Sequence, residues 1–495
     1  MARRRKTGQR TARENLGQLF DGGDFLEYGE FAVAAQRRRR SREELEAISP
    51  ADGLIAGVGQ VNGDQFGEEA GRCVAMAYDY TVMAGTQGYF NHHKTDRMLG
   101  LAETWRAPVV MFTEGGGGRP GDVDAISGSG LAVPSFASYA RLSGLAPVVG
   151  INSGFCFAGN AAFLGCSDVV IATRNSNIGM GGPAMIEGGG LGVFKPTEIG
   201  PAAEQAANGV IDLLVEDEVE AVDAARRYLS YFQGATRDWT CADQRRLRTL
   251  IPENRLRVYD IRAVIAALAD AGSTMELRRD YGAGMVTALI RIEGRPFGLI
   301  ANNPAHLGGA IDAPAADKAS RFMQLCDAFD LPILSLCDTP GFMVGPEVER
   351  TAQVRRVSRM FVTAAGMTVP VFFVVLRKAY GLGAQAMAAG SLHEPFFSVS
   401  WPTGELGPMG LEGAVRLGFR RELEAETDPA AQKALFDRLV AQSYERGKAL
   451  NVASLLELDS VIDPRDTRAW IVRGLRATPA PRPRAGKKRP SIDTW

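Results

Sequence analysis

The sequence predicts an α/β protein made of two tandem domains related by internal duplication. Two long stretches, HKTDRMLGLAETWRAPVVMFTE (93–114) and DKASRFMQLCDAFDLPILSLCD (317–338), match at an offset of 224 residues, as from Lys94 to Lys318. A second pair, APVVGIN from residue 146 and VPVFFVV from residue 369, matches at an offset of 223. Similarity at a nearly constant offset is typical of a repeated structural unit. Short apolar runs alternate with helical patterns in each copy, which favours parallel strands joined by crossover helices.

The first copy gives the order of the elements. Residues 94–105 end shortly before a proline and carry apolar residues at helical spacing: Met98, Leu101, Ala102 and Trp105. The β-rich run PVVMFTE then stops at four glycines, and the chain returns through a helix of small residues (132–143) to the strand PVVGIN. A glycine turn, a further helix and the strand DVVIAT complete the copy, and the second copy repeats this order.

The division between the copies is expected in the charged, irregular stretch 234–255. The sequence therefore predicts an N-terminal domain at 1–240 and a C-terminal domain at 241–477. The basic, proline-containing tail, 478–495, is expected to be flexible.

Composition limits the classes of function. The chain has 495 residues, of which 45% are hydrophobic and 23% charged, and its net charge is −1, which argues against a dedicated nucleic-acid-binding protein. The basic N-terminus lacks the apolar core of a secretory signal, and the longest apolar run, VPVFFVVL, is too short to span a membrane. The six cysteines show no metal-ligand spacing. We expect a soluble, cytoplasmic protein with reduced thiols, no bound metal and no membrane partner.

Seven stretches of the chain resemble the carboxyltransferase component of biotin-dependent acyl-CoA carboxylases. In order, they are TARENLGQLFDGGDFLE, DYTVMAGTQG, GFCFAGNAAFLGCSD, IPENRLRVYDIRAVI, GLIANNP, DTPGFMVG and RKAYGLGAQAM. The resemblance covers nearly the whole length. It implies two crotonase-like domains, in agreement with the internal repeat, with the acyl-CoA on the first domain and biotin on the second.

The resemblance also implies that backbone N–H groups carry the chemistry. Family members have a turn G-x-C-x-A-G-G in the first domain, and GFCFAGN maps its two donors to Ala158 and Gly159. The family's RKAYGGA turn in the second domain maps the other two donors to Leu382 and Gly383. One pair would hold the enolate oxygen of the thioester and the other the ureido oxygen of biotin; each such donor contributes ~3–4 kcal/mol to a transition state. The alternative for either turn is a glycine bend that only packs a strand against a helix.

Residues near the first turn are candidates for binding substrate. Gly117 and Arg119 belong to EGGGGRPGD, a loop through which substrate would approach the first hole, with a flexible surface turn as the alternative. Asn160 lies beside the first hole because the turn reads AGN where the family has AGG. Basic runs at 3–6 and 37–40 are either solvated charge or neighbours of the phosphates of coenzyme A.

Residues near the second turn are candidates for binding biotin or the acyl group. Gly341 and Phe342 of DTPGFMVG match the family loop beside the biotin, with a plain tight turn as the alternative. Tyr380 stands directly before the second turn. Gln385 lies where the family's helix faces the acyl pocket, and it either influences substrate choice or only fills space.

Motifs that the chain lacks indicate its partners. We find no MKM biotinylation motif and no ATP-binding glycine motif, so biotin is expected on a separate biotin carboxyl carrier that a biotin carboxylase loads. In the family, the active site forms between domain one of one subunit and domain two of another. A homo-oligomer, commonly a hexamer built as a trimer of dimers, is therefore expected.

Two segments depart from the family pattern and leave the acyl substrate open. IGPAAEQAANGVID replaces a segment that carries His and Ser in many members, and GGPAMIEGGGLGVFKP (181–196) resembles multidomain long-chain acyl-CoA carboxylases. The alternatives are a biotin-dependent decarboxylase subunit, a crotonase-type hydratase or isomerase that uses only the first hole, and a binding protein without activity. A hydratase needs carboxylates near the hole, and the helix after Gly159 begins NAAFLG, which has none.

Overall fold

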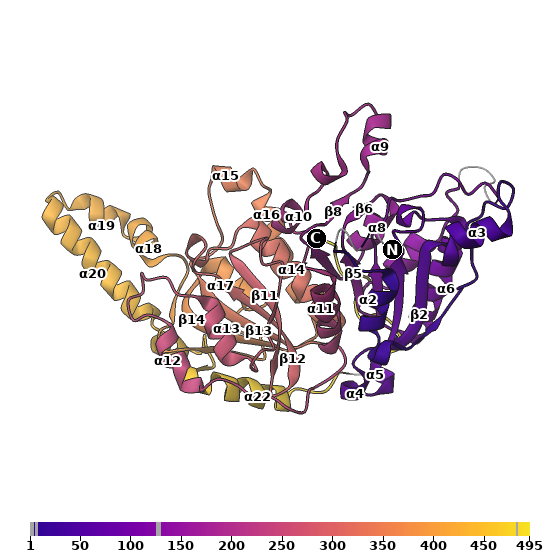
Figure 1. The fold of residues 1–495 in the computed structure, drawn as a ribbon. Helices are drawn as coiled ribbons and strands as arrows, with labels where there is room; N and C mark the ends of the chain where they lie inside the picture. The colour runs from indigo at the N-terminus through magenta and orange to yellow at the C-terminus, as the bar shows by residue number, and fades with distance from the viewer. Residues whose placement is uncertain (1–3, 5–7, 125–129, 482–483) are drawn as a thin grey trace. The chain divides into compact units, whose positions relative to one another are not determined.

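Each half of the chain builds its own mixed sheet in the computed structural model (Figure 1), which describes residues 4, 8–124, 130–481 and 484–495. Contacts group the chain into a first unit, Met1–Ala235 with Arg484–Thr494, and a second unit, Thr236–Pro483 with Trp495. The division after Ala235 lies inside the irregular stretch 234–255. The α/β class expected from the alternating pattern is confirmed.

The strands of the first unit are β1 (Phe25–Glu27), β2 (Leu54–Gln60), β3 (Arg72–Tyr78), β4 (Val109–Phe112), β5 (Val148–Asn152), β6 (Phe155–Phe157), β7 (Val169–Thr173), β8 (Asn177–Gly179) and β9 (Leu213–Val215). Seven of them form one sheet in the order β1-β2-β3-β4-β5-β7-β9, and β6 pairs with β8. The pairs β1/β2 and β2/β3 are antiparallel, and the later neighbours are parallel. Every residue of β4, β5 and β7 is buried, as expected for strands covered on both faces.

The strands of the second unit are β10 (Met275–Leu277), β11 (Met285–Ile292), β12 (Arg295–Asn302), β13 (Ile333–Thr339), β14 (Val371–Tyr380), β15 (Phe397–Ser400), β16 (Glu405–Gly407) and β17 (Ser460–Val461). Their order is β10-β11-β12-β13-β14-β15-β17, and β16 pairs with the end of β14. The first two pairs are again antiparallel and the others parallel. The two sheets therefore have the same strand directions in the same sequence.

Hydrogen bonds at the two matched prolines repeat between the units. The bonds run from Val74 N–H to Pro108 O and from Gly298 N–H to Pro332 O, and then from Val109 N–H to Pro147 O and from Ile333 N–H to Pro370 O. Each proline precedes the first residue of a parallel strand and accepts from the neighbouring strand. The matched prolines of the sequence thus occupy matched positions in the two sheets.

Helices connect and cover the strands in both units (Figure 1). Those of the first unit are α2 (Ala12–Leu19), α3 (Arg42–Ile48), α4 (Gly63–Phe66), α5 (Glu68–Gly71), α6 (Tyr89–Trp105), α7 (Ser135–Arg141), α8 (Gly159–Gly165), α9 (Pro183–Gly188), α10 (Ala202–Ala207) and α11 (Glu218–Ser230). Those of the second unit are α12 (Leu247–Leu250), α13 (Ile261–Leu268), α14 (Ala313–Ala328), α15 (Pro346–Glu349), α16 (Gln353–Ala365), α17 (Gly381–Met387), α18 (Leu411–Gly418), α19 (Arg420–Ala425), α20 (Pro429–Gly447), α21 (Ala449–Ser454) and α22 (Thr467–Ala477).

The helix predicted over 94–105 is confirmed as the greater part of α6. Met98, Leu101 and Ala102 are buried in the core of the first unit, as their spacing predicts. Trp105 is exposed, because α6 ends there and Arg106 turns into the left-handed region at φ 52°. The last position of the periodic pattern therefore no longer faces the sheet.

Two matched lysines lie inside the units. Lys94 on α6 donates to Ala51 O and Leu54 O at 2.8 and 2.6 Å, and Lys318 on α14 donates to Tyr281 O at 2.9 Å. Both ammonium groups are buried against main-chain carbonyls. Burial lowers the pKa of Lys94 to about 8 and that of Lys318 to about 7.

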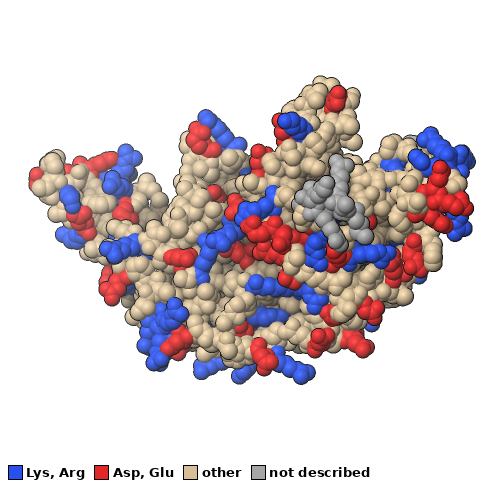
Figure 2. Space-filling model, in the orientation of Figure 1, with Lys and Arg blue, Asp and Glu red and all other residues tan. Residues whose placement is uncertain are grey.

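Parts of the basic segments have defined surroundings. The four arginines at 37–40 are exposed just before α3, and Figure 2 shows basic side chains gathered at this end of the first unit. Of the run 3–6, only Arg4 lies among the described residues. In the tail, Ile492 is buried and its N–H donates to Ser143 Oγ at 2.9 Å.

The described residues contain neither a candidate membrane-spanning helix nor a candidate metal site. No helix among them combines the length and apolar character needed to cross a membrane. Over the same residues, no group of three or more His, Cys, Asp and Glu side chains is arranged to hold a metal ion.

Candidate functional site

The first turn lies between β6 and α8. Phe157 pairs with Gly179 of β8, and the next residue, Ala158, has φ 52° and ψ −121°. The Ala158 N–H donates to Gly179 O at 3.1 Å. The N–H groups of Gly159 and Asn160 lie in the first turn of α8, where N–H groups have no intrahelical acceptor, and no side chain caps this helix start.

The second turn lies between β14 and α17 and has the same construction. Tyr380 pairs with Gly407 of β16, and the next residue, Gly381, has φ 56°. The N–H groups of Leu382 and Gly383 lie in the first turn of α17, where N–H groups have no intrahelical acceptor, and no side chain caps this helix start. In both turns, N–H groups of the first helical turn therefore follow a residue with positive φ.

This shared construction fixes the register between the two turns. Ala158 corresponds to Gly381, so Gly159 corresponds to Leu382, and Asn160 to Gly383. The sequence mapping, which gave Ala158 and Gly159 for the first turn, is one residue out of step with Leu382 and Gly383. The physical reason is that the Ala158 N–H is already used in the bond to Gly179.

Asn160 holds the glycine loop against the first turn. Its Oδ1 accepts from Gly117 N–H at 2.9 Å, and its Nδ2 donates to Gly85 O at 3.3 Å. The side chain is fully buried. A Cβ on Gly117 would lie 2.7 Å from the Ala158 Cβ, so only glycine allows this approach. The side chain of Asn160 is therefore committed to positioning the loop, although its backbone N–H stays open.

Arg119 lies in a buried ion pair below the glycine loop. Its Nη1 is 2.5 Å from Asp52 Oδ1 and 3.4 Å from Asp122 Oδ2, and the other nitrogens donate to Thr86 Oγ1 and to main-chain carbonyls. Burial raises the pKa of Asp52, with Arg119 opposing the rise. All of the guanidinium nitrogens are thus engaged within the first unit. Contact of Arg119 with substrate stays a prediction, and its observed bonds favour a structural role.

A second loop lies against the second turn. A Cβ on Gly383 would lie 2.7 Å from the Cα and carbonyl carbon of Gly341 and 3.1 Å from the Phe342 nitrogen. Gly341 O accepts from Ile311 N–H at 3.0 Å, which fixes the loop, and the Phe342 N–H has no acceptor among the described residues. Gly341 and Phe342 are therefore next to the open N–H of Gly383.

Two further predicted residues flank the second turn. Tyr380 caps the start of α17 with its side chain buried, and its hydroxyl donates to Glu405 Oε2 at 3.1 Å. Burial raises the pKa of that hydroxyl. Gln385 lies on the exposed side of α17.

The sequence reading missed a buried carboxylate at the end of β13. Asp338 is fully buried and accepts from Arg377 Nη2 and Nε at 3.0 and 3.1 Å and from the Tyr259 hydroxyl at 2.8 Å. It also accepts from the Lys378 N–H at 3.2 Å. Arg377 and Lys378, the two basic residues of RKAYGLG, therefore link the end of β14 to the end of β13 through Asp338. The sequence does point to this carboxylate, because the two matched stretches end at the acidic residues Glu114 and Asp338.

A family model and a relative each match nearly the whole chain. A family model for the carboxyl transferase domain matches residues 3–490. The methylmalonyl-CoA carboxyltransferase 12S subunit of Propionibacterium freudenreichii subsp. shermanii is 32% identical over 483 residues, which cover 94% of this chain and 88% of that subunit.

Two solved structures have the same fold. A single-chain, multi-domain long-chain acyl-CoA carboxylase matches with a TM-score of 0.90 and 58% identity over 95% of this chain, which spans 46% of that larger chain. The crystal structure of the transcarboxylase 12S hexamer, with methylmalonyl-coenzyme A and methylmalonic acid bound, matches with a TM-score of 0.85 and 30% identity. That match covers 98% of this chain and 92% of the other.

Proposed function

The chain belongs to the carboxyl transferase family of biotin-dependent acyl-CoA carboxylases, and we propose that it moves a carboxyl group from a biotin carrier to the α-carbon of an acyl-CoA. The observation that carries the proposal is the pair of matching turns, each with a residue of positive φ followed by N–H groups of a first helical turn that no side chain caps. Two preorganised donors are what a developing oxyanion requires.

The first turn would serve the acyl-CoA. Removal of the α-proton places negative charge on the thioester oxygen, and the N–H groups of Gly159 and Asn160 would accept that oxygen between them. The bond from Gly117 to Asn160 Oδ1 keeps the glycine loop beside the turn, so the donors need not reorganise during the reaction. Gly117 and Arg119 then shape the site without touching the substrate.

The second turn would hold biotin. Bound biotin supplies the carboxyl group and a base for the α-proton. The N–H groups of Leu382 and Gly383 would bind its ureido oxygen, with the N–H of Phe342 as a further donor and Gly341 providing the close approach. The backbone fits such an oxygen, because the Phe342 nitrogen lies close to Gly383, at 3.1 Å from where a Cβ on Gly383 would be. Tyr380 and Gln385 would border the ring and the acyl group.

The two units would be crotonase-like domains derived from one ancestor by duplication. The identical sequence of strand directions supports this proposal, as do the matched proline bonds and the matched buried lysines. The domain limits 1–240 and 241–477 remain predictions. They differ slightly from the contact-based division after Ala235.

The acceptor would be a long-chain acyl-CoA. The multi-domain carboxylase with 58% identity acts on long-chain acyl-CoA. A second support is the segment 180–194, which starts directly after Gly179 beside the first turn and projects from the strands of its own unit around α9 (Figure 1). Its exposed apolar side chains are Met180, Met185, Leu191, Val193 and Phe194.

The protein would work as part of a cytoplasmic multi-subunit enzyme. The 12S transcarboxylase relative forms a hexamer, and we expect the same assembly here, together with a biotin carboxylase and a biotin carboxyl carrier. A biotin-dependent decarboxylase subunit is the nearest alternative, because it would use the same two turns. Purification of the native complex with an ATP-dependent carboxylase partner would exclude it.

One experiment tests the activity. The purified protein is incubated with a carboxylated biotin carrier, labelled in the carboxyl group, and with acyl-CoAs of increasing chain length. We expect transfer of label, with kcat/KM rising toward long chains. If no acyl-CoA of any length accepts label, the proposal fails. Hydration of an enoyl-CoA without biotin would instead favour the crotonase-type alternative.

A further inference from the structure

The residue directly before the glycine loop of the first unit is a buried carboxylate with distant partners. Glu114 Oε2 lies 2.6 Å from Arg4 Nη1, and Glu114 Oε1 accepts from Gln9 Nε2 at 3.1 Å. Both side chains of the ion pair are more than nine-tenths buried. Two residues of the N-terminal segment therefore reach the start of the glycine loop.

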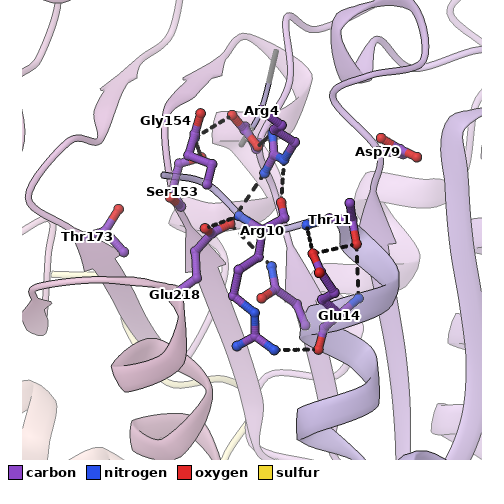
Figure 3. Close-up of polar contacts among 12 residues, drawn as sticks. Arg4, Arg10, Thr11, Glu14, Asp79, Ser153, Gly154, Thr173 and Glu218 are labelled. Carbon is purple, nitrogen blue, oxygen red and sulfur yellow. Dashed lines mark hydrogen bonds and ion pairs between the residues drawn. The ribbon is translucent and has the colours of Figure 1, made fainter. Parts of the chain in front are cut away.

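The partners of Glu114 are themselves anchored. Arg4 Nη2 is 3.3 Å from Glu218 Oε1, and Arg10 N–H donates to Glu218 Oε2 at 2.6 Å. Gln9 Nε2 also donates to Ser153 O at 3.3 Å. Figure 3 shows Arg4, Arg10 and Glu218 close together beside α2. The guanidinium of Arg4 is thus shared between two buried carboxylates.

The carboxylate is tied to the first turn by close backbone contacts. A Cβ on Gly154 would lie 2.4 Å from Glu114 Oε1, and one on Gly85 would lie 2.3 Å from Glu114 O. Gly85 O in turn accepts from Asn160 Nδ2, and Gly115 N–H donates to Phe155 O at 2.8 Å. A shift of Glu114 would therefore move both the glycine loop and Asn160.

We propose that Glu114 is a positioning residue for the first turn, and that Arg4 holds it in place from the N-terminal segment. The role rests on the proposed function, because the turn is the donor pair for the acyl-CoA. Arg4 plays the part in the first unit that Arg377 plays for Asp338 in the second.

The ionisation of the Glu114 carboxyl gives a second, pH-dependent way to test the proposal. Burial raises the pKa of Glu114 to about 7, while Arg4 opposes the rise and Glu218 adds to it. The other groups facing the carboxylate are Gln9 and the buried thiol of Cys156. Because Glu114 is half ionised near pH 7 and the ion pair with Arg4 requires the charged carboxylate, we expect the order of the loop to increase from pH 6 to pH 8.

The test compares Glu114→Gln and Arg4→Gln with the matched control Arg13→Gln. Arg13 lies on α2 in an exposed ion pair with Glu27 and does not contact the loop. We expect kcat with acyl-CoA to fall about tenfold in either variant, since small misplacements of a reacting group cost one to two orders of magnitude. The double variant should lose no more than the single ones, because both break one unit. The control should keep the wild-type kcat.

Hydrogen–deuterium exchange supplies a readout that does not depend on activity. Peptides that span the glycine loop should exchange faster in both variants than in wild type at pH 8, and the pH 6 to pH 8 change of wild type should disappear in Glu114→Gln. Unchanged exchange in the loop, or losses of kcat that add in the double variant, would overturn the proposal. An inactive wild type with faster loop exchange in the variants would refute the proposed function while leaving the positioning role supported.

Stability separates positioning from a general structural role. A carboxyl whose folded pKa is raised stabilises the fold when protonated, and this contribution is lost as the pH rises from 4.5 to about 7. The Tm of Glu114→Gln relative to that of wild type should therefore rise as the pH increases from 5.5 to 8, although the kcat of the variant is lower. A Tm difference that shifts in favour of wild type over this pH range would contradict the role.

Discussion

The two units present the same backbone turn but support it with different residues. In the second unit, Asp338 is held by Arg377, which lies on β14, the strand that leads directly into the turn. In the first unit, the matching Glu114 is held by Arg4, which is far away along the chain. The geometry of the donors is thus preserved while the source of the positive charge differs.

This difference has a consequence for folding. The Asp338 pair forms as soon as β13 and β14 are neighbours in the sheet, so the second turn is supported by its own strands. The Glu114 pair forms only when the N-terminal segment packs beside α2 and α11. We therefore expect the first turn to be the more easily disturbed of the two.

The largest effect is expected from Gly383→Ala. Its Cβ would lie 2.7 Å from the backbone of Gly341, which cannot yield as a flexible side chain would. We expect the transfer rate to fall about 100-fold or more, in line with the loss of an oxyanion donor. Gly418→Ala in α18, where a Cβ meets nothing within 4 Å, is the control and should leave the rate unchanged. A Gly383→Ala enzyme with the wild-type rate would remove the second turn from the mechanism.

The next effect tests the support of the second turn. Asp338→Asn leaves Arg377 without its buried counter-charge, and breaking such a pair costs about 3–5 kcal/mol. Glu114→Gln should cost less, because Arg4 keeps Glu218 as a partner. Urea unfolding of the two variants at pH 8 measures the difference. Equal losses of unfolding free energy in the two variants would contradict the difference between the Asp338 and Glu114 ion pairs.

A smaller effect concerns the matched lysines and pH. The folded-state pKa values of Lys318 and Lys94, about 7 and about 8, lie below the ordinary value of 10.5. The unfolded chain therefore binds protons that the folded chain has released, and stability rises with pH above these values. Wild type should gain Tm over Lys318→Met between pH 7 and pH 9, and gain less over Lys94→Met. If the Tm of wild type fell relative to that of the variants as the pH rises, the burial of an uncharged lysine would be contradicted.

The smallest effect is expected at Ala158. This residue has φ 52°, where a side chain is disfavoured, and glycine occupies the matching position in the second unit. Ala158→Gly should raise the free energy of unfolding by about 1 kcal/mol by relieving this strain. Denaturant titration measures whether the free energy of unfolding rises or falls. A destabilised Ala158→Gly would mean that the Cβ contacts outweigh the strain.

Much of the architecture could be predicted from the sequence because the same pattern of strands, helices and turns occurs in both copies. The offset between the copies gave the helices, the strands and the matched prolines, and the glycine turns marked both candidate sites. The exact donors could not be read in the same way, since nothing in GFCFAGN shows that the Ala158 N–H is bonded to Gly179. The distant contact between Arg4 and Glu114 depends on packing of the N-terminal segment, which no local pattern encodes.

Residue roles near the turns were also beyond the sequence. Arg119 looks like a free cation in a glycine loop, but its buried partners Asp52 and Asp122 come from other parts of the first unit. Asn160 looks like a substrate contact, but both polar atoms of its side chain bind main chain. In each case the buried bonds of the side chain favour a role in positioning the loop, and these partners cannot be read from the local sequence.

The central claim is that backbone N–H groups in the two turns carry the chemistry, and amide-to-ester replacement tests it most directly. Incorporation of the α-hydroxy analogue of leucine at position 382 removes one N–H and keeps the side chain. We expect a transfer rate about 100-fold below wild type, whereas the same replacement at Leu417, exposed on α18, should leave the rate unchanged. A position-382 ester with the wild-type rate would contradict the account.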